Sequence, residues 1–300
     1  MSKILNGKII RDKIATKLSS QFSVLSPRPK LVIIQVGDLP ESNAYIRQKI
    51  LFGQKIGATV DHKKFADDVS QEELITHISS LNTDPAISGI IVQLPIPKHL
   101  DKATIIEAID PKKDVDGQTS TNIKYLFENK KAGFIPATTK GILTLLNYYQ
   151  IPVHGKNVTV IGRSSLVGKP TALALINLDA TVTVCHSSTK KLPEKTKNAD
   201  ILIVAVGKAK LIKSYHVSSD QTVIDVGINP ITQNRVQPSS SLSQKPESEP
   251  LKGKLVGDVD FDEVSKIVSA ITPVPGGIGP MTVASLFENL LEASIRQNPK

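Results

Sequence analysis

The sequence predicts an α/β protein of two domains with a cleft between them. At 300 residues the chain is long enough for two compact domains of ordinary size. Short apolar runs alternate along it with helix-length segments of mixed polar and apolar residues. This alternation is typical of parallel sheets covered by helices. A glycine-containing turn follows the run Val158–Ile161, as in nucleotide-binding folds.

Six apolar runs are predicted to form buried strands. They are Leu31–Val36, Gly89–Leu94, Val158–Ile161, Thr181–Cys185, Ile201–Val206 and Thr222–Val226. A helix around Ile142–Leu146 and the turn Pro152–Gly155 indicate a domain junction near residues 136 to 156. A last helix is expected from Val283 onward, and its sequence is compatible with packing on either domain.

The composition excludes several classes of protein. The net charge of +9 fits either a solvated basic surface or a cleft that attracts polyanionic small molecules. Aromatic residues make up only 4% of the chain, which argues against a stacking platform for nucleic acid. A single cysteine, Cys185, excludes an internal disulfide and a zinc site of the Cys/His type, and indicates a reducing compartment. No apolar run approaches the roughly 20 residues of a membrane span, so a soluble cytoplasmic protein is expected.

Residues 230–254 are predicted to be a flexible insertion. Their composition shifts abruptly to Ser, Gln, Pro, Lys and Glu. Such a segment buries too little apolar surface to offset the entropy lost on ordering. We expect Gln237–Pro250 to form a surface loop without a catalytic part.

A helix is predicted after the first strand, with Asp38 as its cap, Pro40 in its first turn and Gly57 at its far end. Ser42, Tyr45 and Lys49 would share one face of it. Spacing alone is compatible with a solvated face. The alternative is that Lys49 transfers protons, because desolvation and a cationic substrate would lower its pKa toward neutrality.

Two polar side chains mark a second candidate region. Gln93 is a lone amide in an apolar run, so its partner is either backbone or a ligand at the carboxyl end of the sheet. Asp116 lies beside Gly117 in a charged turn. That turn is either an ordinary surface feature or the source of a carboxylate that accepts paired N–H bonds from an aminopyrimidine-like ring.

The turn after Val158–Ile161 is a candidate dinucleotide site. Gly162 and Gly168 lie where a Rossmann-type turn needs a close backbone approach, although the spacing differs from GxGxxG. The next strand ends in hydroxyl residues that include Ser187, where NAD enzymes carry a ribose-binding acid. Together with Arg163, these hydroxyls suit a 2′-phosphate and favour NADP over NAD.

Eight segments spread over nearly the whole chain match, in order, the motifs of one enzyme family. They are Ser42-x-x-Tyr45-x-x-x-Lys49, Val92–Pro95, Lys113–Gly117, Gly162–Ser164, Val167–Pro170, Asp225–Asn229, Gly257–Val259 and Thr272–Thr282. With them the chain resembles the bifunctional methylenetetrahydrofolate dehydrogenase/cyclohydrolase family. Each segment is short, but the ordered set is specific.

The resemblance implies roles for individual residues. The implied catalytic residues are Lys49, Tyr45 stacking on or orienting the folate, Gln93 supporting the lysine, and Asp116 holding the pterin. The other implied folate-binding residues are Ser42, Val92, Leu94, Val274, Pro275, Gly276, Gly277 and Ile278. The implied NADP-binding residues are Thr138, Gly162, Arg163, Ser164, Ser187, Ile228 and Thr282. No metal is implied.

The resemblance also implies an activity and an architecture. The activity is NADP-dependent oxidation of 5,10-methylenetetrahydrofolate and hydrolysis of the product to 10-formyltetrahydrofolate, in one-carbon metabolism and purine biosynthesis. Residues 1–138 with 273–300 would form the folate-binding domain, and residues 139–272 a Rossmann-like NADP-binding domain. Two protomers would pair through the nucleotide domains as a homodimer, with neither nucleic acid nor membrane as partner.

Two departures and three alternatives accompany this interpretation. One departure is the Ser/Pro-rich insertion before Gly257, and neither departure involves Lys49. Phe134–Thr139 stands where the family usually has Pro-Cys-Thr-Pro, so the approach to the cofactor at Thr138 is expected to differ. The alternatives are a dehydrogenase without cyclohydrolase activity, a catalytically silent folate- or nucleotide-binding module, and a basic nucleic-acid binder. Loss of turnover with retained binding in Lys49→Gln would distinguish the enzyme from a silent module.

Overall fold

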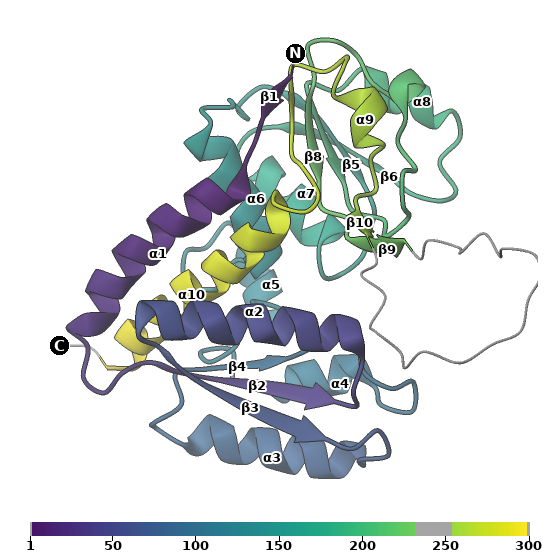
Figure 1. Cartoon of the computed structure of the whole chain (residues 1–300). Helices are drawn as coiled ribbons and strands as arrows, with labels where there is room; N and C mark the ends of the chain where they lie inside the picture. Colours follow the sequence, from purple (N-terminus) through teal and green to yellow (C-terminus); the bar gives the residue numbers. More distant parts are fainter. Residues whose placement is uncertain (1, 232–253, 299–300) are drawn as a thin grey trace, which may run out of the picture.

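Two parallel sheets form the centre of the computed structural model, which describes residues 2–231 and 254–298 (Figure 1). The first sheet has the order β3-β2-β4, with bounds Thr59–Phe65, Lys30–Val36 and Gly89–Val92. The second has the order β1-β11-β8-β7-β5-β6, with bounds Lys3–Ile4, Ala270–Ile271, Thr222–Asp225, Ile201–Val204, Asn157–Ile161 and Thr181–Cys185. Every pairing within these two sheets is parallel, which confirms the predicted α/β class.

Helices pack around both sheets. Their bounds are α1 Gly7–Ser23, α2 Pro40–Ile56, α3 Gln71–Thr83, α4 Lys102–Glu107, α5 Ser120–Phe127, α6 Ala137–Tyr148, α7 Gly168–Ile176, α8 Leu192–Lys197, α9 Phe261–Val264 and α10 Ile278–Gln297, with a 3-10 turn η1 at Ser214–His216. No helix among the described residues combines the length and the apolar character needed to cross a bilayer.

All six predicted strands are present, and β4 and β7 end two residues earlier than expected. The apolar pattern misses the short strands β1, β9, β10 and β11, of two or three residues each, and one long strand, β3, Thr-Val-Asp-His-Lys-Lys-Phe. It pairs only with β2 and lies at the edge of the first sheet, so its side chains are half-buried or exposed. An edge strand of this kind needs no continuous apolar run, because it is not covered on both faces.

The predicted cap of α2 is wrong. Leu39, not Asp38, is the N-cap residue, and its side chain makes no capping bond. A residue before proline is disfavoured in the helical region, so Pro40 forces Leu39 into an extended conformation and the helix begins after it. The Asp38 carboxylate instead accepts a hydrogen bond from Asn43. The far end is as predicted, with Gly57 in the left-handed conformation at φ 83°.

The last helix joins the two halves of the molecule. It begins at Ile278, earlier than predicted, and packs against α1 and α6, so it lies in the middle of Figure 1. Its Phe287 lies against Phe52 of α2, with ring centroids 5.3 Å apart. One apolar core therefore extends from β2 and α1 through α10 and α6 to β5 and β7.

The first strand belongs to the second sheet. Lys3 and Ile4 pair with Ala270 and Ile271 of β11, and α1 then runs from that sheet toward the first one (Figure 1). The predicted insertion at 230–254 has ordered ends, because β9 (Asn229–Ile231) and β10 (Lys254–Val256) pair antiparallel. The predicted loop Gln237–Pro250 lies outside the described residues.

Candidate active site

The lysine face of α2 meets the end of β4. Lys49 is half-buried, and its Nζ donates a hydrogen bond of 2.8 Å to Gln93 Oε1. The Gln93 amide in turn donates to the carbonyl of Leu94 at 2.8 Å. The lone polar residue of the β4 run is thus fixed by one backbone contact and aims its oxygen at the lysine. The structure therefore brings together two residues predicted from separate segments.

Asp116 gives this pair an opposite charge. Burial lowers the pKa of Lys49 from its usual range, and the Asp116 carboxylate partly opposes that effect. Burial also raises the pKa of Asp116, against the favourable charge of Lys49. An amine whose pKa is lowered is suited to proton transfer, and the ionised Asp116 carboxylate, favoured by the charge of Lys49, is suited to accept paired N–H groups of a ring.

Gln118 is a partner of Asp116 that the sequence did not reveal. Its Nε2 donates to Asp116 Oδ2 at 2.7 Å and holds the carboxylate in one orientation. The turn that carries Asp116 is stabilised by Asp114, whose carboxylate accepts hydrogen bonds from Thr119 N and Asn122 Nδ2. The only signal for these hydrogen bonds in the sequence is the polarity of the segment after Asp116. The conformation of the turn determines the partners, and a turn has no periodic pattern.

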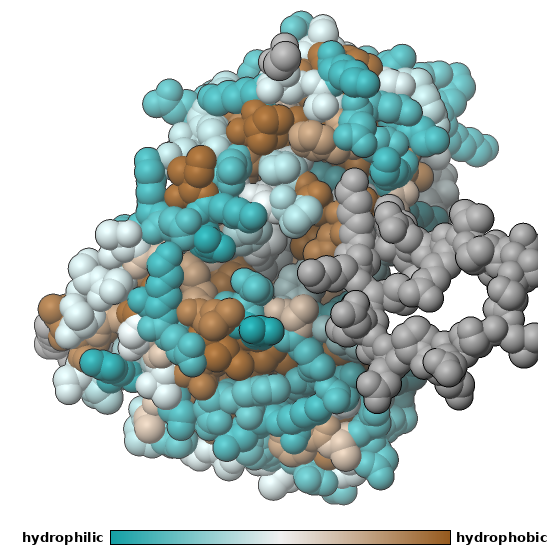
Figure 2. Space-filling model, viewed as in Figure 1, coloured by the Kyte–Doolittle hydropathy of each residue, from teal (hydrophilic) through white to brown (hydrophobic). Residues whose placement is uncertain are grey.

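A cavity of about 640 Å³ lies beside this cluster, between α2, the start of α10 and the end of β8. Figure 2 shows apolar surface on both sides of the hollow and hydrophilic residues around it. Tyr45 and the whole predicted loop Val274–Ile278 line the cavity, as does Ile228. Lys49, Gln93 and Asp116 are not among its lining residues, nor are Ser42, Val92 and Leu94. Tyr45 and Lys49 are one turn apart on α2, so the cavity adjoins the polar cluster.

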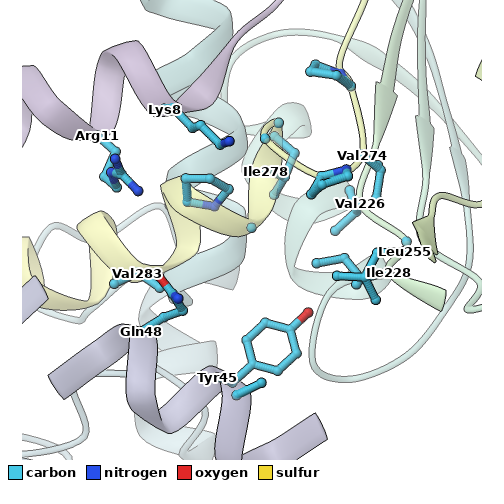
Figure 3. Close-up of a pocket in the computed structure, with 18 of the residues that line it drawn as sticks. Lys8, Arg11, Tyr45, Gln48, Val226, Ile228, Leu255, Val274, Ile278 and Val283 are labelled. Carbon is cyan, nitrogen blue, oxygen red and sulfur yellow. The ribbon is translucent and has the colours of Figure 1, made fainter. Parts of the chain in front are cut away.

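Some lining residues were not predicted. Figure 3 shows Lys8 and Arg11 reaching toward the cavity from α1, and Gln48 from α2. Of the predicted residues around it, Ser42 is buried and its hydroxyl has no hydrogen-bond partner among the described residues. Val92 is also buried, whereas Leu94 is half-buried. The sequence offered no pattern for Lys8 and Arg11 beyond the positive charge of the chain.

The predicted dinucleotide turn links β5 to α7. Gly162 has φ 120°, and a Cβ added to it would lie 2.2 Å from the carbonyl oxygen of Ala205. A Cβ on Gly168 would lie 2.2 Å from the carbonyl oxygen of Gly162. Only glycine therefore permits this close passage of three backbone segments. Ser164 Oγ accepts from the N–H groups of Val167 and Gly168 at the start of α7, and Arg163 is exposed. A turn so tight, with a helix start behind it, fits a dinucleotide phosphate.

The remaining predicted cofactor residues lie on other elements, after β6, in α6 and α10, and after β8. Ser187 is exposed just after β6, which neighbours β5 in the sheet. Thr138 in α6 and Thr282 in α10 come together, with their hydroxyl oxygens 3.3 Å apart. Ile228 follows β8 and lines the same cavity as Tyr45 and Val274–Ile278, so a predicted cofactor residue shares a wall with predicted substrate residues.

Two buried aspartates shape that wall. Asp258 accepts hydrogen bonds from the backbone N–H groups of Val206, Gly207 and Lys208, which follow β7. Asp225 accepts from the N–H groups of Gly227, Asp258 and Val259. Burial raises the pKa of Asp225 to about 7. These contacts explain why aspartates occupy two of the matched segments to which the sequence assigned no role. In residues 2–231 and 254–298 no group of three His, Cys, Asp or Glu is placed to hold a metal ion.

A glycine turn of dinucleotide type in the second sheet and a cavity that adjoins a half-buried amine together indicate a two-domain enzyme of the nucleotide-dependent oxidoreductase class. Two family models match the chain in agreement with this. The catalytic domain of tetrahydrofolate dehydrogenase/cyclohydrolase matches residues 5–116, and the NAD(P)-binding domain of the same enzymes matches residues 136–298. The chain belongs to the tetrahydrofolate dehydrogenase/cyclohydrolase family, as its motifs predicted.

Individual relatives agree over their full length. The bifunctional protein FolD of Lactobacillus helveticus is 43% identical and is aligned over 100% of both chains. The crystal structure of the bifunctional enzyme FolD from Campylobacter jejuni is 39% identical, covers 99% of both chains and superposes with a TM-score of 0.90. The FolD of Trypanosoma brucei, solved with NADP and an inhibitor, is 31% identical, covers 100% of this chain and 99% of its own, and gives a TM-score of 0.91.

Proposed function

We propose that the protein oxidises 5,10-methylenetetrahydrofolate to 5,10-methenyltetrahydrofolate with NADP and then hydrolyses this product to 10-formyltetrahydrofolate. The observation that carries the proposal is the half-buried Lys49 amine, held by Gln93 at 2.8 Å, opposite Asp116 and one turn from Tyr45 at the cavity. The relatives named as bifunctional FolD support the same pair of reactions.

The substrate would lie with its pterin toward the polar cluster and its remainder along the apolar cavity. Asp116 is suited to accept N–H bonds from the pterin, because its carboxylate is held in one orientation by Gln118. Tyr45 offers an aromatic face at the cavity, and Val274–Ile278 form the opposite wall. Ser42, Val92 and Leu94 would complete the pterin side.

The residues present fit NADP at the β5–α7 turn, since side chains at Gly162 or Gly168 would fill the approach to the backbone. Gly162, Ser164 and Ile228 would hold the dinucleotide, while Arg163 and Ser187 would face its 2′-phosphate. Thr138 and Thr282 would lie at the boundary with the substrate. Bound NADP supplies the hydride acceptor of the first reaction.

Lys49 would handle the proton of the second reaction. A water oxygen bonds to the methenyl carbon and gives up a proton. The bond from that carbon to the ring nitrogen then breaks, the departing nitrogen takes up a proton, and the hydroxyl loses its own proton to leave the formyl group on the other nitrogen. A neutral amine accepts that proton, and burial favours the neutral amine. Gln93 positions the amine by accepting its hydrogen bond.

The wider assignments are also proposals. The packing of α10 on α1, α2 and β4 supports grouping residues 273–300 with residues 1–138 as the folate-binding domain, with 139–272 as the nucleotide domain that α10 also contacts through α6. A cytoplasmic location fits a chain with one buried cysteine, Cys185. The product would serve as a formyl donor in one-carbon metabolism, which includes purine biosynthesis.

A homodimer paired through the nucleotide domains would cover the edge strand β6. Val184 of that strand is 41% exposed, and Ile176 and Leu178 before it are exposed too. Light scattering of the native chain and of Val184→Lys tests this pairing. A native dimer that becomes a monomer in the variant is expected, whereas a monomeric native chain would contradict the proposal.

A coupled assay with NADP and NAD in parallel tests the activity. NADPH formation and methenyl absorbance are followed together with 5,10-methylenetetrahydrofolate as substrate. We expect reduction of NADP with little methenyl accumulation. Methenyl that persists beyond spontaneous hydrolysis would leave a dehydrogenase alone, and equal use of NAD would contradict the role given to Arg163 and Ser187.

A further inference from the structure

We infer that Asn289, on the last helix, is a positioning residue that sets the place of Asp116 in the substrate site. The inference rests on the proposed function, because it takes Asp116 to bind the folate. Asn289 is 1% exposed and lines neither cavity wall, so it acts through other residues.

The Asn289 amide ties together two chain segments that flank Asp116. Its Nδ2 donates to the carbonyl oxygen of Val115 at 2.9 Å and to that of Ile135 at 3.0 Å. Val115 directly precedes Asp116, and the Asp116 carbonyl accepts from Ala137 N on the second segment. One hydrogen of the amide is therefore used on the segment that carries the carboxylate, and the other on the segment bonded to it.

The orientation of this amide is fixed from α6. Lys140 Nζ donates to Asn289 Oδ1 at 2.8 Å. A charged donor on the oxygen keeps the NH₂ group toward the two carbonyls, because a flipped amide would face the ammonium with its own hydrogens. Lys140, Asn289 and Val115 thus form a chain of contacts from α6 through α10 to the substrate turn.

The two tied segments are in close contact, so their spacing has little freedom. Gly117 has φ 69°, and a Cβ on it would lie 2.7 Å from the carbonyl oxygen of Phe134. Without the Asn289 amide, the carbonyl oxygens of Val115 and Ile135 would each lose a hydrogen-bond donor. The turn would then move to satisfy them, and Asp116 with it.

The test measures folate affinity separately from NADP affinity. Asn289→Leu removes both donors, Lys140→Met removes only the group that orients the amide, and Ser285→Ala is the matched control. Ser285 is buried on the same helix and its hydroxyl has no partner among the described residues. Each variant is titrated calorimetrically with 5-formyltetrahydrofolate and with NADP, and thermal unfolding identifies variants that fail to fold.

We expect Asn289→Leu to weaken 5-formyltetrahydrofolate binding by about tenfold, and Lys140→Met by about threefold, with NADP affinity within about twofold of native. Ser285→Ala should bind both ligands as the native chain does. If Asn289→Leu does not fold, the Lys140→Met result decides. A folded variant with native folate affinity, or one that loses both ligands equally, would overturn the inference.

A second arm asks whether the effect passes through Asp116. Asp116→Asn alone is expected to weaken folate binding, and adding Asn289→Leu to it should change the affinity by less than about twofold. If the losses of folate affinity in the two single variants add fully in the double variant, Asn289 acts independently of Asp116. That result would overturn this inference but not the proposed function. Native folate binding in Asp116→Asn would overturn the assignment of Asp116 to the folate, and the inference with it.

Discussion

Burial changes the protonation of Lys49 and Asp116 in opposite senses, and each side chain moderates the change in the other. The pKa of the amine falls and the pKa of the carboxyl rises, while their mutual attraction opposes both shifts. A substrate with a positive charge would lower the pKa of Lys49 further. The residue pair is therefore sensitive to what occupies the site.

Lys49→Gln should abolish the cyclohydrolase step while leaving folate binding largely intact. Glutamine keeps a polar group near Gln93 but accepts no proton, and general acid–base groups are worth about 10²–10⁴ in rate. In the native enzyme the cyclohydrolase rate should rise with pH as the Lys49 amine loses its proton. Because burial lowers the pKa of this amine, the neutral form is populated at a lower pH than in an exposed lysine. Methenyl decay as a function of pH measures both effects.

The control for this substitution is Lys102→Gln, an exposed lysine of α4. It should keep the native rate and pH profile. A Lys49→Gln enzyme that hydrolyses methenyltetrahydrofolate at the native rate would remove Lys49 from the mechanism.

Asp225 predicts a pH dependence of stability. Its pKa is raised from 3.8 to about 7, so between these values the folded state keeps a proton that the unfolded state releases. The stability from this group is complete below about pH 4 and is lost as pH rises through about 7. Asp225→Asn should flatten that fall in the free energy of unfolding, measured by denaturant titration at pH 5 and pH 8.

Asp220→Asn gives the comparison, since Asp220 is an exposed aspartate of the same half of the chain. It should leave the native difference between the two pH values unchanged. The assignment fails if Asp225→Asn retains that difference.

At the scale of elements, the conformation of the β5–α7 turn requires glycine at position 162. Gly162→Ala should weaken NADP binding by at least about tenfold, since the added Cβ would meet the Ala205 carbonyl and φ 120° disfavours alanine. Folate binding should remain, because Gly162 is not among the cavity residues. Calorimetric titration with NADP and with 5-formyltetrahydrofolate measures the two affinities.

Gly155→Ala separates backbone strain from the steric clash. Gly155 has φ 69°, but an added Cβ would have no neighbour within 4 Å. It should lose some stability and keep NADP affinity. Equal NADP binding by Gly162→Ala and Gly155→Ala would contradict the close approach inferred for the turn.

The sequence predicted most buried elements, and its errors have physical causes. The strands β2, β5, β7 and β8 were recognisable because both faces of a central parallel strand are covered, and the edge strands β4 and β6 also carry apolar runs. The polar edge strand β3 lacks that pattern. The cap of α2 moved to Leu39 because Pro40 restricts its predecessor, an effect that outweighs the capping preference of Asp38.

The candidate site was predicted unevenly for similar reasons. Lys49, Gln93 and Tyr45 stand on regular elements, and the structure brings the first two into contact. Gln118 and Asn289 were missed because their contacts cross a turn and a long stretch of chain. A single sequence carries no local pattern for such contacts.

At the scale of the whole molecule, the shared apolar core predicts that both halves unfold together. Phe287 is fully buried where α10 meets α2, and Phe287→Ala should cost about 3–5 kcal/mol. The chain contains no Trp, so a single Trp reporter can follow each half separately: Phe65→Trp in β3 of the first sheet, and Tyr215→Trp in η1 of the half that contains the second sheet. Denaturant titrations by Trp fluorescence should give coincident transitions that shift equally in Phe287→Ala.

Two separate transitions, or a shift confined to one reporter, would contradict a single cooperative unit. Ile295→Ala is the control, because this side chain of the same helix is 51% exposed. It should move neither transition appreciably.

The packing of α10 between α1 and α6 also bears on how the chain is made. A ribosome releases the N-terminus first, and the first strand then waits for β11, more than 260 residues later, before it has a partner. The shared apolar core likewise lacks the side chains of α10 until residues 278–297 have been translated. The nascent chain therefore cannot complete one domain and then the next, because both halves wait for the same helix.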